Sequence, residues 1–410
     1  MRTFDKSAKL DNVLYDVRGP VVDEAAKMEE EGKEILKLNI GNPYPFGFSA
    51  PQEVILDMLS NIRTSQGYSD SKGIFSARKA IMQYAQLRGI PNVTMNDIYT
   101  GNGVSELISL CMQALLDNGD EILIPAPDYP LWTATATLAG GKVVHYICDE
   151  QSDWYPDIED IRSKITDRTK AIVIINPNNP TGAVYPKEIL EQIAQIAREK
   201  ELIIFSDEIY DRLVMDGKQH VSTAALAEDV PMVTMNGLSK SHCLCGYRCG
   251  WMVLSGPRAL TDEYREGIVQ MTSMRLCANA LAQVAIPAAL QDMETPASMV
   301  RPGGRLYEQR EAAVRELQKI DGISFVKNDA AFYIFPRLDV RKFGITDDKK
   351  FARDLLYNTH ILLVPGSGFD WHDPDHFRIV MLPQAEVLSD AIRRMGTFLD
   401  GYHQDWRKYA

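Results

Sequence analysis

Short runs of apolar residues recur through the middle of the chain and predict buried β-strands. The runs cover 97–100, 121–125, 142–148, 171–176, 202–206, 232–235 and 251–254. Stretches with helical spacing lie between several of them, including 105–116 and 187–200. This alternation of strand and helix predicts an α/β fold with a mostly parallel sheet.

The alternating pattern occupies residues 55–295 and leaves a segment at each end of the chain. The C-terminal block opens at Arg301-Pro-Gly-Gly304, a sequence typical of a turn. It predicts a long helix over 305–320, a strand pair formed by 324–326 and 331–335, a further helix and a second strand pair. We therefore expect a large domain over 55–295 and a smaller α+β domain built from 1–54 and 296–410.

The composition adds limits on partners and location. The 410 residues carry 56 acidic and 44 basic side chains, and the net charge of -12 repels nucleic acids and anionic membranes. The first thirty residues lack the apolar core of a signal peptide, and no stretch is apolar enough for a membrane helix. Six cysteines in so long a chain without an export signal favour free thiols. We expect a cytoplasmic protein that binds neither nucleic acids nor membranes.

Candidate chemistry lies where apolar runs end, because ligands of open α/β sheets collect at the carboxyl ends of the strands. Asn179, Asp207 and Lys240 each follow such a run and are separated by 28 and 33 residues, close to the length of one βαβ unit. Taken alone, each has a structural explanation, namely a turn residue, a helix cap and a solvated lysine. Their common register makes a shared site the better interpretation.

Five motifs then identify a family. They are Asn179-Pro-Thr-Gly182, Ser206-Asp-Glu-Ile-Tyr210, Ser239-Lys240, Arg248 eight residues later, and Arg378 within Phe377-Arg-Ile-Val380. With them, nearly the whole chain resembles the fold-type I, class I/II aminotransferases, which depend on pyridoxal 5'-phosphate. The resemblance implies an α/β large domain with a mostly parallel seven-stranded sheet, together with a smaller α+β domain.

The resemblance also implies the catalytic roles of three residues. Lys240 would form a Schiff base with the cofactor aldehyde and, once displaced by substrate, carry the Cα proton as general base and acid. Asp207 would pair with the pyridine nitrogen and keep it protonated. Tyr210, together with Asn179, would hydrogen-bond the phenolic oxygen of the cofactor. An ordinary core aromatic is the alternative for Tyr210.

Further residues are expected around the cofactor. The turn before helix 105–116 offers backbone N–H groups to an anion, and the resemblance makes it the phosphate cradle. Arg248 would pair with the same phosphate. Tyr129 occupies the place of the aromatic ring that stacks on the pyridine, and Tyr68 matches a tyrosine that reaches the phosphate of the other subunit in a homodimer. The expected cofactor contacts are thus Gly103, Val104, Ser105, Tyr129, Asn179, Asp207, Tyr210, Ser239, Lys240, Arg248 and Tyr68.

Substrate residues are expected in both terminal segments, so an amino acid or a 2-oxo acid would lie between the two domains. Arg378 suits a carboxylate because its guanidinium offers two parallel donors, and Gly41 matches a glycine that lets the backbone approach the substrate. Asn179 and Tyr15 complete the expected set. Arg18 is either a second arginine over the substrate or a surface residue of the N-terminal segment.

Two clusters of histidine, cysteine and aspartate suggest metal sites, but the spacing of their residues departs from that of common metal sites. His242, Cys243, Cys245 and Cys249 crowd one loop, yet no distant second pair accompanies them, and His372-Asp-Pro-Asp-His376 contains a proline that prevents a helical face. We expect no metal. One departure from the family concerns Gly237, where many relatives carry a serine that contacts the phosphate.

The substrate pair is inferred from less general stretches that resemble bacterial alanine (glutamate–pyruvate) aminotransferases. They include Tyr15-Asp-Val-Arg-Gly-Pro20, Leu38-Asn-Ile-Gly-Asn-Pro43 and Gly303-Gly-Arg-Leu-Tyr-Glu-Gln309. They favour L-alanine plus 2-oxoglutarate giving pyruvate plus L-glutamate. A broad-specificity aminotransferase and a carbon–sulfur lyase remain alternatives, since the same lysine and aspartate serve both.

Overall fold

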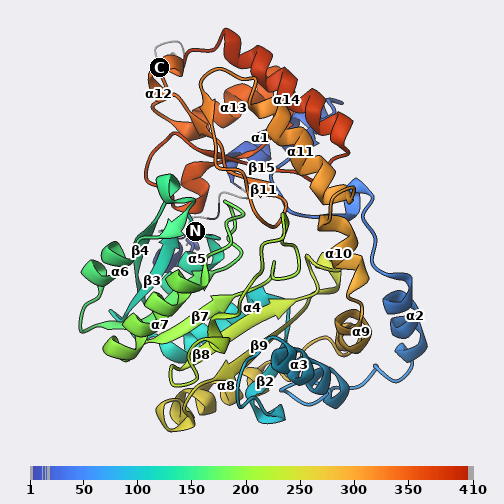
Figure 1. Ribbon diagram of the computed structural model, residues 1–410, viewed down its shortest axis with the longest axis vertical. Coiled ribbons are helices and arrows are strands. Elements are labelled where there is room, and N and C mark those ends of the chain that lie inside the picture. The colour runs from blue at the N-terminus through green and yellow to red at the C-terminus, as the bar shows by residue number, and fades with distance from the viewer. Residues whose placement is uncertain (1–2, 12, 14, 16–18, 405–410) are drawn as a thin grey trace.

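The computed structural model of this chain describes residues 3–11, 13, 15 and 19–404. Its centre is an eight-stranded sheet in the order β2-β9-β8-β7-β6-β3-β4-β5 (Figure 1). The strands are β2 (Ile98–Asn102), β9 (Cys249–Ser255), β8 (Met232–Gly237), β7 (Ile203–Asp207), β6 (Thr169–Ile175), β3 (Glu121–Ala126), β4 (Lys142–Asp149) and β5 (Tyr155–Pro156). All seven predicted runs form strands, and the eighth strand is a two-residue edge that is too short to stand out as an apolar run.

The sheet is mostly parallel, as expected. Pairs β3·β4, β3·β6, β6·β7 and β7·β8 are parallel, whereas β9 runs antiparallel to both of its neighbours and β5 runs antiparallel to β4. The carboxyl ends of β6, β7 and β8 therefore meet at one edge of the sheet. Asp207 is the last residue of β7, and Asn179 and Lys240 lie in the segments that follow β6 and β8.

Helices cover both faces of the sheet, which explains why its strands are continuous apolar runs rather than alternating ones. In β6, Val173 packs with one cluster that includes α4 (Val104–Leu115), α5 (Leu131–Leu138) and α8 (Asp262–Met274). Ile172 and Ile174 of the same strand pack into the opposite cluster. That cluster includes residues of α2 (Gln52–Asn61), α3 (Phe75–Leu87), α6 (Ile158–Lys164), α7 (Lys187–Lys200) and α9 (Ala280–Gln291).

The residues at the ends of α7 and α4 explain where these helices begin and end. Helix α7 has the predicted bounds because Pro186 precedes it and Glu201 ends it in the left-handed conformation. The predicted helix over 105–116 is observed one residue earlier at each end, as α4, after Gly103 at φ 83°. A side chain at Gly103 would be strained at this φ, and a Cβ there would lie 2.3 Å from Nη2 of Arg248.

Residues from both ends of the chain share a separate hydrophobic cluster. Val21, Ala25, Met28 and Leu38 pack with residues from 313–399. In Figure 1, α1 (Pro20–Glu30) lies beside the C-terminal helices above the sheet. Strand β1 (Leu36–Lys37) pairs in parallel with β13 (Ile361–Leu362). The remaining α-helices of the described chain are α10 (Glu294–Val300), α11 (Arg305–Leu317), α12 (Val340–Phe343), α13 (Asp348–Thr359) and α14 (Ala385–Asp400). A further short strand, β14 (Val364–Pro365), follows β13.

The predicted pairing of 324–326 with 331–335 is wrong. Strand β10 (Ile323–Ser324) pairs with β12 (Arg337–Leu338), while β11 (Tyr333–Ile334) pairs with β15 (Phe377–Val380). These strands are only two to four residues long, so tertiary contacts rather than a local apolar pattern choose their partners.

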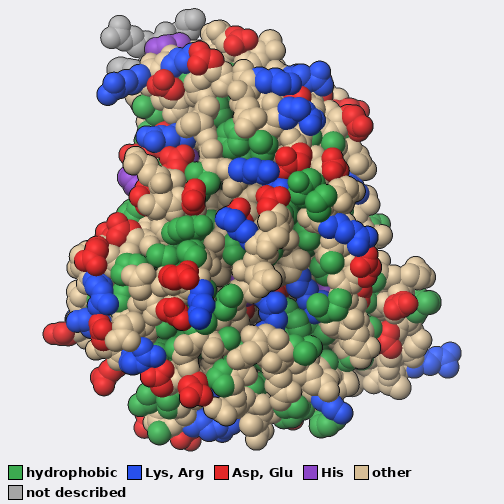
Figure 2. All heavy atoms as spheres, viewed as in Figure 1, with side chains coloured by type: hydrophobic (Ala, Val, Ile, Leu, Met, Phe, Trp, Pro, Cys, Tyr) green, Lys and Arg blue, Asp and Glu red, His purple; other side chains and the backbone are tan. Residues whose placement is uncertain are grey.

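Figure 2 shows acidic and basic side chains interspersed over the face turned to the viewer. Across the described residues, no helix combines the length and apolar character needed to cross a membrane.

Candidate active site

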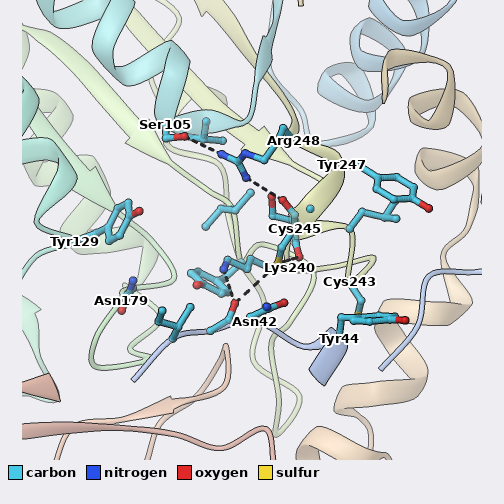
Figure 3. A pocket seen from close by; sticks show the side chains of 18 of the residues that line it. Asn42, Tyr44, Ser105, Tyr129, Asn179, Lys240, Cys243, Cys245, Tyr247 and Arg248 are labelled. Atoms are coloured by element: carbon cyan, nitrogen blue, oxygen red, sulfur yellow. Dashed lines mark hydrogen bonds between the residues drawn. The ribbon is translucent and has the colours of Figure 1, made fainter. Parts of the chain in front are cut away.

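A cavity of about 1090 Å³ opens at the carboxyl ends of β6, β7 and β8. It is closed by the segment that follows β1 and by side chains from β11 and β15. Most of the predicted site residues line it, namely Tyr15, Gly41, Val104, Ser105, Tyr129, Asn179, Asp207, Tyr210, Ser239, Lys240, Arg248 and Arg378. Figure 3 shows Lys240 and Arg248 between Tyr129 and Asn179 on one side and Tyr44 and Tyr247 on the other.

Lys240 lies three residues beyond the end of β8 and extends into the cavity. Its Nζ donates a hydrogen bond of 2.8 Å to the backbone oxygen of Gly41 and lies 5.9 Å from the centroid of the Phe332 ring. In the part of the chain that the structure describes, this is the one hydrogen bond that holds the amine, so little has to be broken for the nitrogen to react inside the cavity.

Asp207 ends β7 at the floor of the cavity and is 4% exposed. Its Oδ2 accepts a hydrogen bond of 3.3 Å from Nε1 of Trp132, and its Oδ1 accepts one of 3.3 Å from the amide of Ile209. Burial raises the pKa of this carboxyl to about 6, although the two hydrogen bonds oppose the rise. A buried carboxylate with a raised pKa is stabilised by a nearby cation, so this position fits a protonated pyridine nitrogen.

Arg378 is buried in the wall of the cavity, 2% exposed, without an acidic partner among the described residues. Nη1 donates 2.7 Å to Oδ1 of Asn179, Nη2 donates to the backbone oxygen of Asn39, and Nε has no partner within the described part of the chain. Burial lowers the pKa of the guanidinium. A desolvated cation of this kind favours an anionic ligand, and its planar donors suit a carboxylate.

The start of α4 and Arg248 form the anion-binding part of the site. Gly103 precedes the helix, and the first N–H groups of an α-helix have no intrahelical partners. Arg248 donates from Nη2 to Oγ of Ser105 at 2.8 Å and from Nη1 to the backbone oxygen of Cys245 at 3.0 Å. Gly103 does not itself line the cavity, but it lets the Arg248 guanidinium pack against the turn. These donors fit a phosphate group.

Two pairs of tyrosines also line the cavity. The hydroxyl groups of Tyr210 and Tyr333 are 2.7 Å apart, and those of Tyr15 and Tyr129 are 2.9 Å apart. Burial raises the pKa of Tyr210 and of Tyr129, so both phenols act as neutral hydrogen-bonding groups.

Sequence reasoning missed Tyr333 and Trp132. Tyr333 lies in a short apolar run and resembles a core aromatic, and Trp132 lies in an apolar turn of α5. The available signal was the type of residue: a buried tyrosine hydroxyl or indole N–H requires a partner, and here the partners are Tyr210 and Asp207.

Tyr68 is a predicted site residue that does not line the cavity, and its side chain is 84% exposed. Arg18 lies outside the described residues. Gly237 is fixed by packing between β8 and β9, since a Cβ there would lie 2.7 Å from the backbone oxygen of Cys249. A serine at this position would collide with the neighbouring strand.

Cys243, Cys245 and Cys249, which follow Lys240 in the sequence, are free thiols. Cys243 and Cys245 line the cavity. Sγ of Cys245 donates 2.8 Å to the backbone oxygen of Ser239, and burial raises the pKa of Cys243 to about 12. Within the described ranges, no three His, Cys, Asp or Glu side chains are grouped to hold a metal ion.

Comparison with known proteins identifies the family. The family described as aminotransferase class I and II matches residues 33–394. The chain is 56% identical to the glutamate-pyruvate aminotransferase AlaA of Escherichia coli, covering 98% of this chain and 100% of that protein. It is 52% identical to the alanine aminotransferase of Mycobacterium tuberculosis over 98% of this chain and 94% of the relative. The solved alanine aminotransferase of Pyrococcus furiosus superposes with a TM-score of 0.92 at 41% identity, covering 97% and 100% of the two chains.

These matches confirm the resemblance that the motifs around Lys240 indicated. The chain therefore belongs to the class I and II aminotransferases, enzymes of fold type I that depend on pyridoxal phosphate.

Proposed function

We propose that this protein is an alanine aminotransferase, which converts L-alanine and 2-oxoglutarate to pyruvate and L-glutamate. The observation that carries the proposal is the cavity that joins Lys240 and Asp207 to the buried guanidinium of Arg378. The similarity to AlaA and to two further alanine aminotransferases selects the substrate pair.

The cofactor would be held at both of its ends. Asp207 would pair with the pyridine nitrogen, and Gly103, Val104, Ser105 and Arg248 would surround the phosphate. Tyr129 would pack against the ring, Asn179 and Tyr210 would bond its phenolic oxygen, and Ser239 would lie against the phosphate. When bound, pyridoxal phosphate supplies an electron sink for the charge left on the substrate Cα.

The protein residues would orient the substrate and move its proton. Arg378 would bind the substrate carboxylate, and Gly41 would leave room for the substrate beside the backbone. Lys240 would take the proton from the substrate Cα at its Nζ and deliver it to C4' of the cofactor. Because this amine is hydrogen-bonded only to Gly41 in the described structure, it needs to break a single contact to do so.

The second carboxylate of 2-oxoglutarate needs a further cation. Lys240, Arg248 and Arg378 are the basic side chains of the described cavity wall, and each already has a role in this proposal. Arg18, three residues after Tyr15 in the sequence, therefore remains our candidate for that carboxylate. Tyr15 lines the cavity and is hydrogen-bonded to Tyr129.

The architecture of the enzyme is part of the proposal. The large domain would cover 55–295 and the small domain 1–54 with 296–410, so that substrate lies between them, and closure of the two domains on substrate would shield it from water. A homodimer would bring Tyr68 to the cofactor phosphate of the other subunit. The exposure of Tyr68 and of the apolar Leu56, Leu59 and Ile62 nearby in sequence supports such an interface. The free thiols support a cytoplasmic location.

The test is a substrate screen of the purified protein loaded with pyridoxal phosphate. We expect no more than a single turnover of pyruvate from L-alanine alone, sustained pyruvate release when 2-oxoglutarate is present, and higher kcat/KM for alanine than for other amino acids. Sustained pyruvate release from L-cysteine without an oxo acid would point to a carbon–sulfur lyase, and similar values for many amino acids would point to the broad-specificity alternative.

The dimer is tested separately by light scattering and by Tyr68→Phe. Light scattering of the parent protein should give twice the mass of one chain. The Tyr68→Phe variant should bind the cofactor more weakly than the parent. A fully active monomer would contradict the shared site.

A further inference from the structure

Tyr333 contacts two predicted site residues that lie far apart in the sequence, Tyr210 and Arg378. It lies on β11, is 2% exposed and lines the cavity. Its hydroxyl is 2.7 Å from the hydroxyl of Tyr210, and the face of its ring lies 4.4 Å from Cζ of Arg378. One side chain therefore contacts both the expected partner of the cofactor's phenolic oxygen and the expected substrate arginine.

The surrounding residues fix the position of this side chain. The Tyr210 and Tyr333 rings meet edge to face at 5.6 Å and 81°, and Phe332 packs against both rings. A Cβ on Gly41 would lie 2.1 Å from the Tyr333 hydroxyl oxygen. The absent side chain at Gly41 is thus what makes room for this hydroxyl.

The hydroxyl groups of Tyr210 and Tyr333 share one hydrogen bond, and which of them donates follows from the role proposed for Tyr210. If Tyr210 gives its proton to a cofactor oxygen, its own oxygen accepts the proton of Tyr333. A hydroxyl that accepts a hydrogen bond becomes a stronger donor, because chains of hydrogen bonds polarise one another. Tyr210 would therefore stabilise negative charge on the phenolic oxygen better with Tyr333 behind it than alone.

The ring of Tyr333 acts on the other group. An aromatic face attracts a guanidinium, and the attraction is larger in a desolvated site such as this one. Phe369 lies 4.6 Å from Cζ of the same arginine. The Arg378 plane is thereby held by the two rings, while Nη1 is fixed by Asn179.

We propose that Tyr333 is a positioning residue with two separable actions. Its hydroxyl strengthens Tyr210 as a donor to the cofactor, and its ring orients Arg378 for the substrate carboxylate. The inference rests on the proposed function, because Tyr210 and Arg378 have these tasks only in an aminotransferase site.

Tyr333→Phe tests the hydroxyl, since it keeps the ring. The absorbance of the cofactor-loaded protein is titrated against pH without substrate. We expect the midpoint to move upward by about 0.1 to 0.6 pH unit, because the hydrogen bond from Tyr210 that favours the deprotonated cofactor loses about 10 to 30% of its strength. KM for alanine and for 2-oxoglutarate should stay within about twofold. The matched control is Tyr146→Phe, which removes a buried hydroxyl bonded at 2.8 Å to the Val173 oxygen outside the cavity.

Tyr333→Met and Tyr333→Leu test the ring. Each should show the same upward shift of the midpoint and, in addition, KM values for both substrates raised roughly tenfold, as expected when an arginine loses a cation–π contact in a desolvated site. Two replacements of different shape separate loss of the ring from a local packing defect.

An unchanged midpoint in Tyr333→Phe, or an equal shift in Tyr146→Phe, would overturn the action of the hydroxyl. KM values in the Met and Leu variants equal to those of Tyr333→Phe would overturn the action of the ring. Failure of the proposed function has another signature: the parent protein would show no absorbance band that depends on Lys240.

Discussion

Replacing Asp207 by asparagine should stabilise the cofactor-free protein at neutral pH and weaken its binding of pyridoxal phosphate. The substitution keeps the shape of the side chain, and the asparagine oxygen still accepts the Trp132 N–H. It removes the charge, which is buried at the floor of the cavity, together with the acceptor of the Ile209 amide, because the NH2 group of asparagine cannot accept a hydrogen bond.

The magnitude follows from the pKa of Asp207, raised by burial from an ordinary value near 3.8 to about 6. A carboxyl whose pKa is raised in the folded state contributes stability that is present below pH 4 and is lost as the pH rises to 6. Above pH 6 the ionised group therefore costs about 3 kcal/mol relative to its protonated form. Asparagine does not titrate and escapes this cost at every pH.

The assay is urea unfolding of both cofactor-free proteins at pH 5.0 and 7.5. We expect the advantage of Asp207→Asn in free energy of unfolding to be larger at pH 7.5 by roughly 1 to 2 kcal/mol, the part of the cost that develops between these pH values. The cofactor should reverse the order, because the carboxylate then pairs with the pyridine nitrogen, and the variant should bind it at least about tenfold more weakly. An advantage that is the same at both pH values would refute the reasoning.

The remaining predictions concern the lysine, the substrate arginine and the glycine beside Tyr333. Lys240→Ala should lose at least about a hundredfold in transamination and the absorbance band that stays with the protein in gel filtration; retention of that band would contradict the assignment of Lys240. Arg378→Lys should raise KM for both substrates roughly tenfold to a hundredfold, because the planar pair of donors is lost, while cofactor binding measured by fluorescence stays unchanged. Gly41→Ala should lower both kcat/KM and the unfolding free energy, the latter by about 1 to 3 kcal/mol, because its Cβ would lie 2.1 Å from the Tyr333 hydroxyl oxygen; kinetics equal to those of the parent would show that this contact relaxes freely.

The sequence by itself determined the sheet and the edge at which the chemistry lies. The long strands are buried on both faces, so each appears as a continuous apolar run, and parallel strands place their carboxyl ends together. That is why Asn179, Asp207 and Lys240 could be grouped before their distances were known. Helix α7 was equally readable, because a proline precedes it and its apolar spacing is regular.

Only the tertiary structure decided which distant residues meet. The two-residue strands of the C-terminal part carry too little pattern to choose partners, and β11 pairs with β15 rather than with its neighbour in sequence. Arg378 reaches the backbone oxygen of Asn39 from the other end of the chain, and Tyr333 reaches Tyr210. Such contacts depend on how separate elements pack, and no local spacing encodes them. The sequence therefore located the lysine and the aspartate, whereas the packing revealed the tyrosine that links the cofactor side of the site to its substrate side.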